Sequence, residues 1–479
     1  MTAAPIESSS SASRVAIAGG GLAGLAAGCA LAEAGYRVSL FERRPYLGGR
    51  ASSYQHPGTG EVVDNCQHVL LGCCTNLVDF YRRIGVENKI RWYQELTFLE
   101  PGGKRSVIRP SPLPAPMHTA PAFLRASCLD LPDKLAIGRA MLELAPAMPP
   151  DQGESFRDWL RGHGQTEQAI ERFWKTILVS ALNEDLERVA VPYAAQVVRE
   201  SFLKSEKAGR MGIPTVPLTE LYSAAGEYIE ERGGKVQLRA GVEAFREQGA
   251  GVGVVTDGQQ QTFDYLVMAV PFDVLGRMLA DAHDGNQAAS DLQQALGEFS
   301  TSPITGIHLW FDREISELEH AVLLDRTIQW MFHKSRILET RNQESFEKRN
   351  GSYIELVVSC SRSLVEKSKA DIVEMAAREV KEFFPGARNA TLVKSTVIKE
   401  VHATYSPRPG IERFRPKAAT HWPRVFLAGD YAATGWPATM EGAVRSGYLA
   451  AEALVRATGG RRRFLVPDLP AAGLMKLFG

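Results

Sequence analysis

Several features that would place the chain in a simple class are missing from its 479 residues. The 55 Lys and Arg residues balance the 55 Asp and Glu residues, so the net charge gives no general attraction to nucleic acid. The six cysteines include no C-x-x-C pair, which argues against a disulfide framework and favours a reducing compartment. No apolar run reaches 18 residues, so we expect no membrane-spanning helix.

Signals for export and for metal binding are also missing. Residues 1–13, MTAAPIESSSSAS, are rich in Ser and Ala and contain no apolar core of a secretory signal, so we expect a disordered tail. Residues 66–74 contain three cysteines and His68, but their spacing matches no zinc pattern, and we predict no metal site. These features predict a cytoplasmic protein. Peripheral attachment to the inner face of the cytoplasmic membrane stays open because of apolar segments described below.

The region from residue 14 to residue 42 carries the strongest pattern. Residues 14–18 form a β-branched and apolar run, which predicts a buried strand. G-x-G-x-x-G and a helix of small residues follow, and a second strand then ends on an acid. Glycines let the backbone turn tightly toward a pyrophosphate at the helix N-terminus, and an acid about 20 residues on can accept two ribose hydroxyls. A Gly-rich turn in an ordinary βαβ unit would not explain that acid. The predicted dinucleotide-binding residues are Gly19, Gly21, Leu22, Ala23, Gly24 and Glu42.

Basic residues and a second glycine loop follow the acid. Arg43 and its neighbour could accept a 2′-phosphate, but Glu42 would repel that group, so we interpret them as surface charges. Arg43 is still included among the residues near the cofactor. Residues 48–50, Gly-Gly-Arg, form a flexible loop with a cation, which suits a second approach to a diphosphate or to a flavin edge. Gly49 and Arg50 are therefore candidate cofactor residues.

A second strong motif lies near the other end of the chain. Residues 425–430, VFLAGD, predict a buried strand that ends in an acid able to bond a ribityl hydroxyl. Residues 435–443 then open a helix whose free N–H groups can stabilise negative charge on a reduced flavin. Combined with the first motif, this pattern favours FAD over NAD. The candidate cofactor residues here are Gly429, Asp430, Thr439, Met440 and Ala443.

Together these motifs resemble those of the flavin-containing amine oxidase and phytoene desaturase superfamily. Residues 63–72, VDNCQHVLLG, narrow the resemblance to the hydroxysqualene dehydroxylases, also called squalene-associated FAD-dependent desaturases, of bacterial hopanoid synthesis. Cys66 stands where that family often has Gly. The resemblance implies FAD as cofactor and an α/β fold, in which a Rossmann-like FAD-binding domain is interleaved with an α+β substrate domain. It also implies that the backbone of Val242 touches the adenine.

The two domains are expected to be discontinuous. We expect the FAD-binding domain to span 14–90, 212–300 and 415–458, the substrate domain 91–211 and 301–414, and tails 1–13 and 459–479. Residues 101–150 are Pro-rich and apolar, so they would line a substrate entrance, lie on a membrane surface, or form a loop-rich excursion. The C-terminal tail mixes arginines with apolar residues, which suits either a membrane interface or a packed terminus.

The resemblance implies a reductive reaction on a hydrophobic isoprenoid alcohol. Hydroxysqualene would lose its hydroxyl to give squalene. Its carbinol is allylic, so protonation and water loss leave a delocalised cation that reduced FAD could quench with hydride. We predict His68 as the acid, supported by Asp64 and Asn65, although a core histidine with satisfied nitrogens is an equal interpretation. The reaction also needs an electron donor. The candidate substrate contacts are Gln67, Tyr431 and Trp436, the last two as ring walls, as π faces for a cation, or simply as packing.

Two other functions remain open from the sequence. The first is another reaction of the same superfamily, either carotenoid (phytoene) desaturation or amine oxidation. The second is a non-catalytic FAD-binding partner in a lipid complex. The segment 64–72 favours the squalene branch over the first of these.

Overall fold

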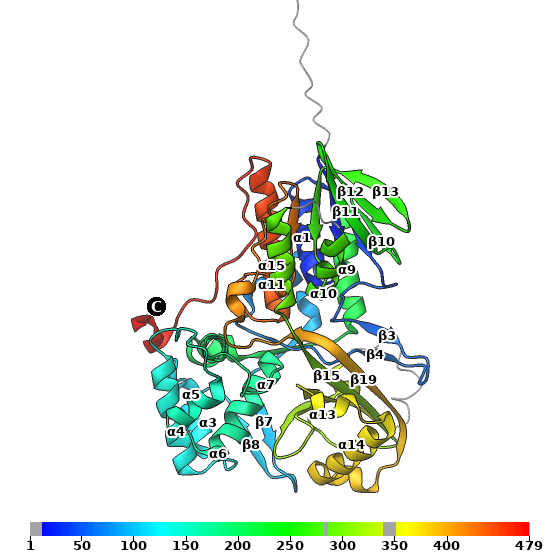
Figure 1. The fold of residues 1–479 in the computed structure, drawn as a ribbon. Helices are drawn as coiled ribbons and strands as arrows, with labels where there is room; N and C mark the ends of the chain where they lie inside the picture. Colours follow the sequence, from blue (N-terminus) through cyan, green and yellow to red (C-terminus); the bar gives the residue numbers. More distant parts are fainter. Residues whose placement is uncertain (1–11, 282–285, 339–350, 479) are drawn as a thin grey trace, which may run out of the picture.

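A parallel sheet of five strands lies at the centre of the half that contains the G-x-G-x-x-G motif (Figure 1). The structure is a computed structural model that describes residues 12–281, 286–338 and 351–478, so most of the expected disordered tail lies outside the described residues. The strand order is β10–β2–β1–β14–β20, and every neighbouring pair is parallel. The strands are β1 (Arg14–Ala18), β2 (Arg37–Glu42), β10 (Lys235–Leu238), β14 (Tyr265–Met268) and β20 (Val425–Leu427). The predicted βαβ unit is therefore completed by strands from distant parts of the chain.

Small residues allow two helices to approach each other closely beside this sheet. Helix α1 (Leu22–Glu33) lies alongside α15 (Met440–Ala457), as Figure 1 shows. A Cβ atom built on Gly447 of α15 would lie 2.3 Å from the Ala23 carbonyl oxygen. On another side of α1, a Cβ on Gly28 would lie 2.8 Å from Ile229 Cδ1 of α9 (Leu218–Glu230). The Ala/Gly composition of α1 is therefore a packing requirement on more than one face.

A seven-stranded sheet forms the base of the second half. Its order is β19–β15–β18–β17–β16–β7–β8. Alternation along β15 sends Ile307 and Leu309 into the core against α14, while Trp310 packs on the opposite face with Val63. The strands are β7 (Leu96–Leu99), β8 (Arg105–Ile108), β15 (Thr301–Phe311), β16 (His320–Leu323), β17 (Trp330–His333), β18 (Ser352–Ser359) and β19 (Leu392–Tyr405), and α14 is Lys369–Phe383.

A helical lobe flanks this sheet, and the C-terminus ends beside it (Figure 1). Its core is aromatic, since Phe156 stacks on Trp159 with ring centroids 5.3 Å apart. The lobe contains α3 (Ala120–Arg125), α4 (Leu131–Leu144), α5 (Phe156–Gly162), α6 (Glu167–Ala169), α7 (Thr176–Leu182) and α8 (Val191–Val198). Among the described residues, no helix combines the length and the apolarity needed to cross a bilayer.

Smaller elements connect the two halves. The hairpin β3–β4 and the three-stranded sheet β5–β9–β6 carry the segments between them, and β11–β12–β13 form a separate antiparallel sheet. The strands are β3 (Ser53–Gln55), β4 (Val62–Asp64), β5 (Leu70–Leu71), β6 (Ile90–Tyr93), β9 (Met211–Pro214), β11 (Val242–Gln248), β12 (Gly251–Thr256) and β13 (Gln259–Phe263). The remaining helices are α2 (Thr75–Arg83), α10 (Phe272–Asp281), α11 (Gln287–Gly297), α12 (Lys334–Ile337) and α13 (Arg362–Val365).

Candidate active site

The turn between β1 and α1 forms a tight cradle of backbone groups. Gly19 has a φ of 109°, and a Cβ there would lie 2.6 Å from the Ala269 carbonyl oxygen. A Cβ on Gly24 would lie 1.9 Å from the Gly19 carbonyl oxygen. Helix α1 begins at Leu22, with Gly21 as its N-cap, so Leu22 and Ala23 present free N–H groups at the turn. This geometry can bind a pyrophosphate.

Glu42 lies beside the cradle and is held in a fixed orientation. Its Oε2 accepts a hydrogen bond from the Gly20 N–H at 2.7 Å, and its Oε1 accepts one from the Arg44 N–H at 2.8 Å. Each oxygen keeps another lone pair, which can accept a ribose hydroxyl. Val242 is close by, because the Ala240 N–H donates to the Glu42 carbonyl oxygen at 2.9 Å. The predicted adenosine residues therefore lie together.

Arg50 joins segments from opposite ends of the chain. Its NH2 lies 2.5 Å from Asp430 Oδ1, and its NH1 donates to the Ala403 carbonyl oxygen at 2.9 Å. A Cβ on Gly49 would lie 2.9 Å from Gly21 Cα, so the second glycine loop packs directly on the first. Arg43, by contrast, is exposed at the end of the adenosine side.

The N-terminus of α15 completes this arrangement. Thr439 is its N-cap, and the Thr439 Oγ1 accepts a hydrogen bond from the Gly442 N–H at 3.1 Å. Met440 and Ala443 lie in the first turn. The Gly429 N–H donates to Ser446 Oγ at 2.8 Å, which ties the end of β20 to the helix. The acid predicted to bind the ribityl chain therefore follows a residue that is held beside the first two turns of α15.

Residues 64–68, which we call the site segment, run between the Gly-Gly-Arg loop and β15. Asn65 Nδ2 donates to the Arg50 carbonyl oxygen at 2.7 Å, and Asn65 Oδ1 accepts from the Ser52 N–H at 3.2 Å. On the other side, a Cβ on Gly306 of β15 would lie 3.1 Å from the Asn65 carbonyl oxygen. Asn65 therefore fixes the glycine loop through its side chain.

His68 is half-buried within the site segment. Its Nδ1 lies 2.7 Å from the Cys66 carbonyl oxygen, which places the ring proton on Nδ1 and leaves Nε2 as the acceptor nitrogen. Burial lowers the pKa of His68, so the ring is neutral at pH 7 and must gain a proton before it can act as an acid. Asp64 directs its carboxylate to Lys334 and Ser53 rather than to this histidine. Its predicted support for His68 would therefore act at a distance.

The three candidate substrate contacts have different surroundings. Gln67 Oε1 accepts a hydrogen bond from Lys334 Nζ at 2.7 Å. Tyr431 is fully buried, and its ring packs edge-on against two phenylalanines, with no hydrogen bond to its hydroxyl from the described residues. Trp436 lies under the Arg445 guanidinium, 4.6 Å from the ring centroid, and packs against Cys73. The structure thus gives each side chain a packing or bonding role within the protein, and substrate contact stays a prediction.

An apolar cavity of about 770 Å³ lies in the helical lobe. Its apolar lining includes Leu96, Phe98, Phe123, Met141, Phe173 and Ile177. The Pro-rich segment 101–150 supplies much of this wall, and its role as a substrate entrance stays a prediction. Leu96 also packs against the hydrophobic cluster that contains Cys66, so this cluster connects the cavity wall to the site segment, although no residue of the site segment lines the cavity.

The comparisons with known proteins identify the family. The family model described as flavin containing amine oxidoreductase matches residues 22–455. The chain belongs to this family. Among curated relatives, the 15-cis-phytoene desaturase of Synechococcus elongatus is 29% identical over 478 residues, covering 92% of this chain and 96% of that protein. The probable zeta-carotene desaturase of the same organism is 27% identical over 484 residues, covering 93% and 99%.

Solved structures agree on the fold. An oxidoreductase from Methanosarcina mazei superposes with a TM-score of 0.69 at 17% identity, covering 91% of this chain and 98% of that one. A putrescine oxidase bound to putrescine gives a TM-score of 0.69 at 17% identity, covering 93% and 99%. The predicted α/β fold is confirmed. This flavin-containing amine oxidoreductase is an FAD-dependent enzyme, and the strained glycines and Glu42 provide the close backbone approach and the acceptor that FAD requires.

Two positioning side chains of this flavoenzyme escaped the sequence analysis. Arg415 is buried, and its guanidinium donates to the carbonyl oxygens of Asp430 and Ala432 and to Thr434 Oγ1. It therefore fixes the loop that follows β20. No local motif surrounds Arg415, so only the folded structure brings it to the site.

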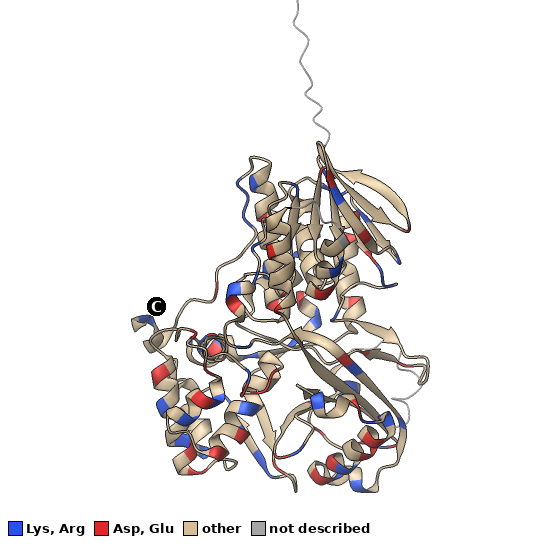
Figure 2. Ribbon diagram, viewed as in Figure 1, with Lys and Arg blue, Asp and Glu red and all other residues tan. Residues whose placement is uncertain are grey.

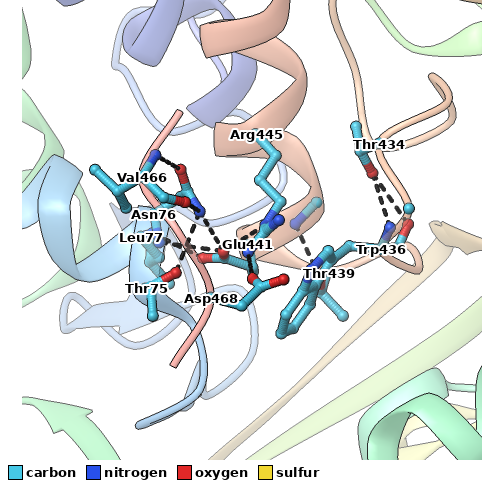
Figure 3. A network of polar contacts seen from close by, with 12 residues as sticks. Thr75, Asn76, Leu77, Thr434, Trp436, Thr439, Glu441, Arg445, Val466 and Asp468 are labelled. Carbon is cyan, nitrogen blue, oxygen red and sulfur yellow. Dashed lines mark hydrogen bonds and ion pairs between the residues drawn. The ribbon is translucent and has the colours of Figure 1, made fainter. Parts of the chain in front are cut away.

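The second is Glu441, at the start of α15 (Figure 3). Its Oε2 accepts from the Leu77 N–H at 2.7 Å, its Oε1 accepts from the Asn76 N–H at 3.1 Å, and Arg445 Nε donates to Oε1 at 2.6 Å. Glu441 thus caps α2 from another helix. The helix-opening motif places Glu441 in the first turn of α15, but the residues that it caps lie more than 360 positions away in the sequence.

Proposed function

We propose that the protein reductively removes the hydroxyl of hydroxysqualene to give squalene in bacterial hopanoid synthesis. The cavity of about 770 Å³, which one hydrophobic cluster connects to the site segment, carries this proposal, because its apolar lining suits a long isoprenoid chain. The desaturases among its relatives are named for long isoprenoid substrates, phytoene and zeta-carotene. The resemblance of residues 63–72 to the hydroxysqualene dehydroxylases favours the alcohol as substrate.

One polar side chain in the cavity wall also supports an alcohol. His118 lines the cavity and is 3% exposed, and its Nδ1 has no hydrogen-bond partner among the described residues. Burial lowers the pKa of His118, so the ring is neutral at pH 7. A neutral imidazole can bond the hydroxyl while the alcohol lies in the cavity, before that hydroxyl reaches His68, whereas a hydrocarbon offers it no partner.

The chemistry divides between cofactor and protein. Reduced FAD supplies the two electrons, and an unidentified electron donor must restore them. The protein holds the isoprenoid away from water in the apolar cavity, which protects an allylic cation. His68 remains the proposed proton donor. It would take a proton at Nε2 and pass it to the leaving hydroxyl, so that water departs.

Carotenoid desaturation is the second candidate, because the curated relatives compared above are phytoene and zeta-carotene desaturases. Desaturation removes electrons from the isoprenoid, whereas dehydroxylation adds them. The two candidates therefore need opposite redox states of the enzyme at the start of turnover.

We further propose that the rim of the cavity rests on a membrane surface, which would place the enzyme on the inner face of the cytoplasmic membrane. The C-terminal segment docks at this rim, since the Leu474 N–H donates to the Ala115 carbonyl oxygen at 2.8 Å. Charges of both signs are scattered over the lobe (Figure 2), so apolar contact would dominate attachment. The exposed apolar side chains are Leu113, Met117, Leu124, Leu131, Leu135, Leu142 and Met148 of the lobe, and Leu474, Leu477 and Phe478 of the tail.

Paired product analysis tests the proposal. Anaerobic, dithionite-reduced holoenzyme is mixed with hydroxysqualene in vesicles, and oxidised holoenzyme is mixed with phytoene in the same vesicles. The proposal expects squalene in the first mixture and unchanged phytoene in the second. A desaturated carotenoid in the second mixture, with no squalene in the first, would establish the second candidate instead.

A further inference from the structure

A buried group of charged side chains lies beneath the site segment, and the chemistry above does not use it. Lys334 follows β17 and is 1% exposed. Its Nζ donates to Asp64 Oδ2 and to Gln67 Oε1, both at 2.7 Å, and lies 3.5 Å from Glu355 Oε2. Glu355 belongs to β18. The ammonium therefore joins the site segment to the seven-stranded sheet.

The two carboxyl groups around this ammonium are not equivalent. Asp64 Oδ1 also accepts hydrogen bonds from Ser53 Oγ at 2.5 Å and from the Leu218 N–H at 3.3 Å. Glu355 is 0% exposed, and within the described part of the chain neither of its oxygens accepts a hydrogen bond of good geometry, since Lys334 Nζ is 3.5 Å from Oε2. Burying two carboxylates with one cation would leave an uncompensated negative charge. The favoured arrangement is an ionised Asp64 and a protonated Glu355.

The pKa directions agree with this geometry. Burial raises the pKa of Glu355 to about 8, against the opposing effect of Lys334. Burial also acts on Asp64, but Lys334 and the hydrogen bonds to Asp64 outweigh it and lower the pKa of that carboxyl. Burial lowers the pKa of His308, opposite Glu355 on β15, to about 3. The titratable groups near Glu355 are thus Lys334, Asp64, His308, Tyr353 and Cys66, and burial raises the pKa of the last two.

We propose that Glu355 is a proton-holding positioning residue of the flavin site, coupled to the site segment through Lys334. Loss of its proton adds a buried negative charge beneath residues 64–68. That charge disfavours the negatively charged reduced flavin and weakens the attachment of the segment to the sheet. The inference rests on FAD binding and not on the choice of isoprenoid, so failure of hydroxysqualene turnover would leave it standing.

The midpoint potential of bound FAD, measured against pH by reductive titration, tests this coupling. In the unaltered holoprotein, we expect the midpoint potential to fall more steeply with pH near pH 8 than at lower pH, because Glu355 loses its proton there. Glu355→Gln mimics the protonated carboxyl and keeps the Lys334–Asp64 pair, so this extra fall should vanish. Lys334→Met removes the cation, so the pH at which this extra fall occurs should rise by about 1–3 units.

A matched control separates the buried cation from surface charge. Lys394 of β19 pairs with Glu61 at 2.7 Å, and both side chains are about one-third exposed. Lys394→Met should leave the potential profile unchanged. Identical profiles in the unaltered protein and in Glu355→Gln would overturn the proposal.

Infrared spectroscopy provides a second readout that needs no turnover and no flavin. We expect a carbonyl band of a buried protonated carboxyl in the apoprotein at pH 7, which disappears as the pH passes about 8. The band should be missing from Glu355→Gln. If the unaltered protein lacks the band at pH 7, Glu355 is ionised and the proposal fails, even if Lys334→Met does not fold.

Discussion

At the scale of single residues, the carboxylate of Glu42 is the part of the sequence motif that we expect to contribute most directly to FAD affinity. Both of its oxygens are already oriented by backbone N–H groups, so its acceptor geometry exists before the cofactor binds. Substitution by Gln keeps the shape but removes the charge that strengthens hydrogen bonds to ribose hydroxyls. A hydrogen bond to a charged group contributes about 1.5–3 kcal/mol.

We therefore predict that Glu42→Gln weakens FAD binding by about 10- to 100-fold. Equilibrium titration of the apoprotein, followed by flavin fluorescence, measures this change. Arg313→Gln is the control, because Arg313 is 55% exposed, follows β15 in the other half of the molecule and should change the affinity little. Equal losses of affinity in the two variants would show that Glu42 does not bind the adenosine ribose.

Glu355 predicts a pH dependence of stability. Its pKa rises from the usual 4.5 to about 8 on folding, so between these values the folded state binds more protons than the unfolded state. The free energy of unfolding should therefore fall as the pH rises from about 4.5 to about 8, and level off above. Denaturant unfolding of the apoprotein at several pH values should show a flatter profile for Glu355→Gln. Parallel profiles would contradict the raised pKa.

Local spacing explains which residues the sequence could predict. Gly19, Gly24 and Glu42 act within one βαβ unit, and the structure places them together as expected. Lys334 and Asp64 lie 270 positions apart, and no spacing rule pairs them. The role of Asp64 as a partner of Lys334 therefore became visible only after the strands were arranged.

Two helices illustrate the same limit at the scale of elements. The sequence predicts a helix after residue 435, and α15 begins at Met440. It does not reveal that Glu441 of α15 caps α2, because the capped residues Asn76 and Leu77 lie more than 360 positions away. Helix positions follow from local pattern, whereas caps between helices follow from packing.

Glu441→Ala should destabilise the protein strongly. The change leaves the N–H groups of Asn76 and Leu77 without their acceptor and removes one carboxylate from the buried Arg445. Breaking a buried pair of this kind costs about 3–5 kcal/mol in the free energy of unfolding. Denaturant unfolding measures the loss, with Glu374→Ala on the exposed face of α14 as control. A loss below about 1 kcal/mol would show that the cap is dispensable.

The apolar rim belongs to the scale of the whole molecule, because it combines the lobe with the distant C-terminal segment. We predict that Leu135→Ser, Leu142→Ser and Leu477→Ser together lower binding to phosphatidylcholine–phosphatidylglycerol vesicles by at least about tenfold. These side chains are 65%, 70% and 79% exposed. Flotation of the holoprotein with vesicles measures the change.

The control variant has the same type of substitution, an exposed apolar residue changed to Ser, elsewhere on the surface. Leu238 and Val393 are 42% and 57% exposed, on β10 and β19, away from the cavity rim. Leu238→Ser with Val393→Ser should leave flotation unchanged. If both sets of variants bind vesicles as the unaltered protein does, the rim is not a membrane contact.

The reaction itself joins all three scales: the motif residues bind FAD, the elements place the site segment, and the lobe supplies the cavity. The most direct measurement is a single anaerobic turnover. Fully reduced holoenzyme is mixed with excess hydroxysqualene, flavin absorbance is followed, and squalene is quantified by mass spectrometry. We predict flavin reoxidation with one squalene formed per FAD oxidised. A flavin that stays reduced, with no squalene formed, would contradict the proposed function.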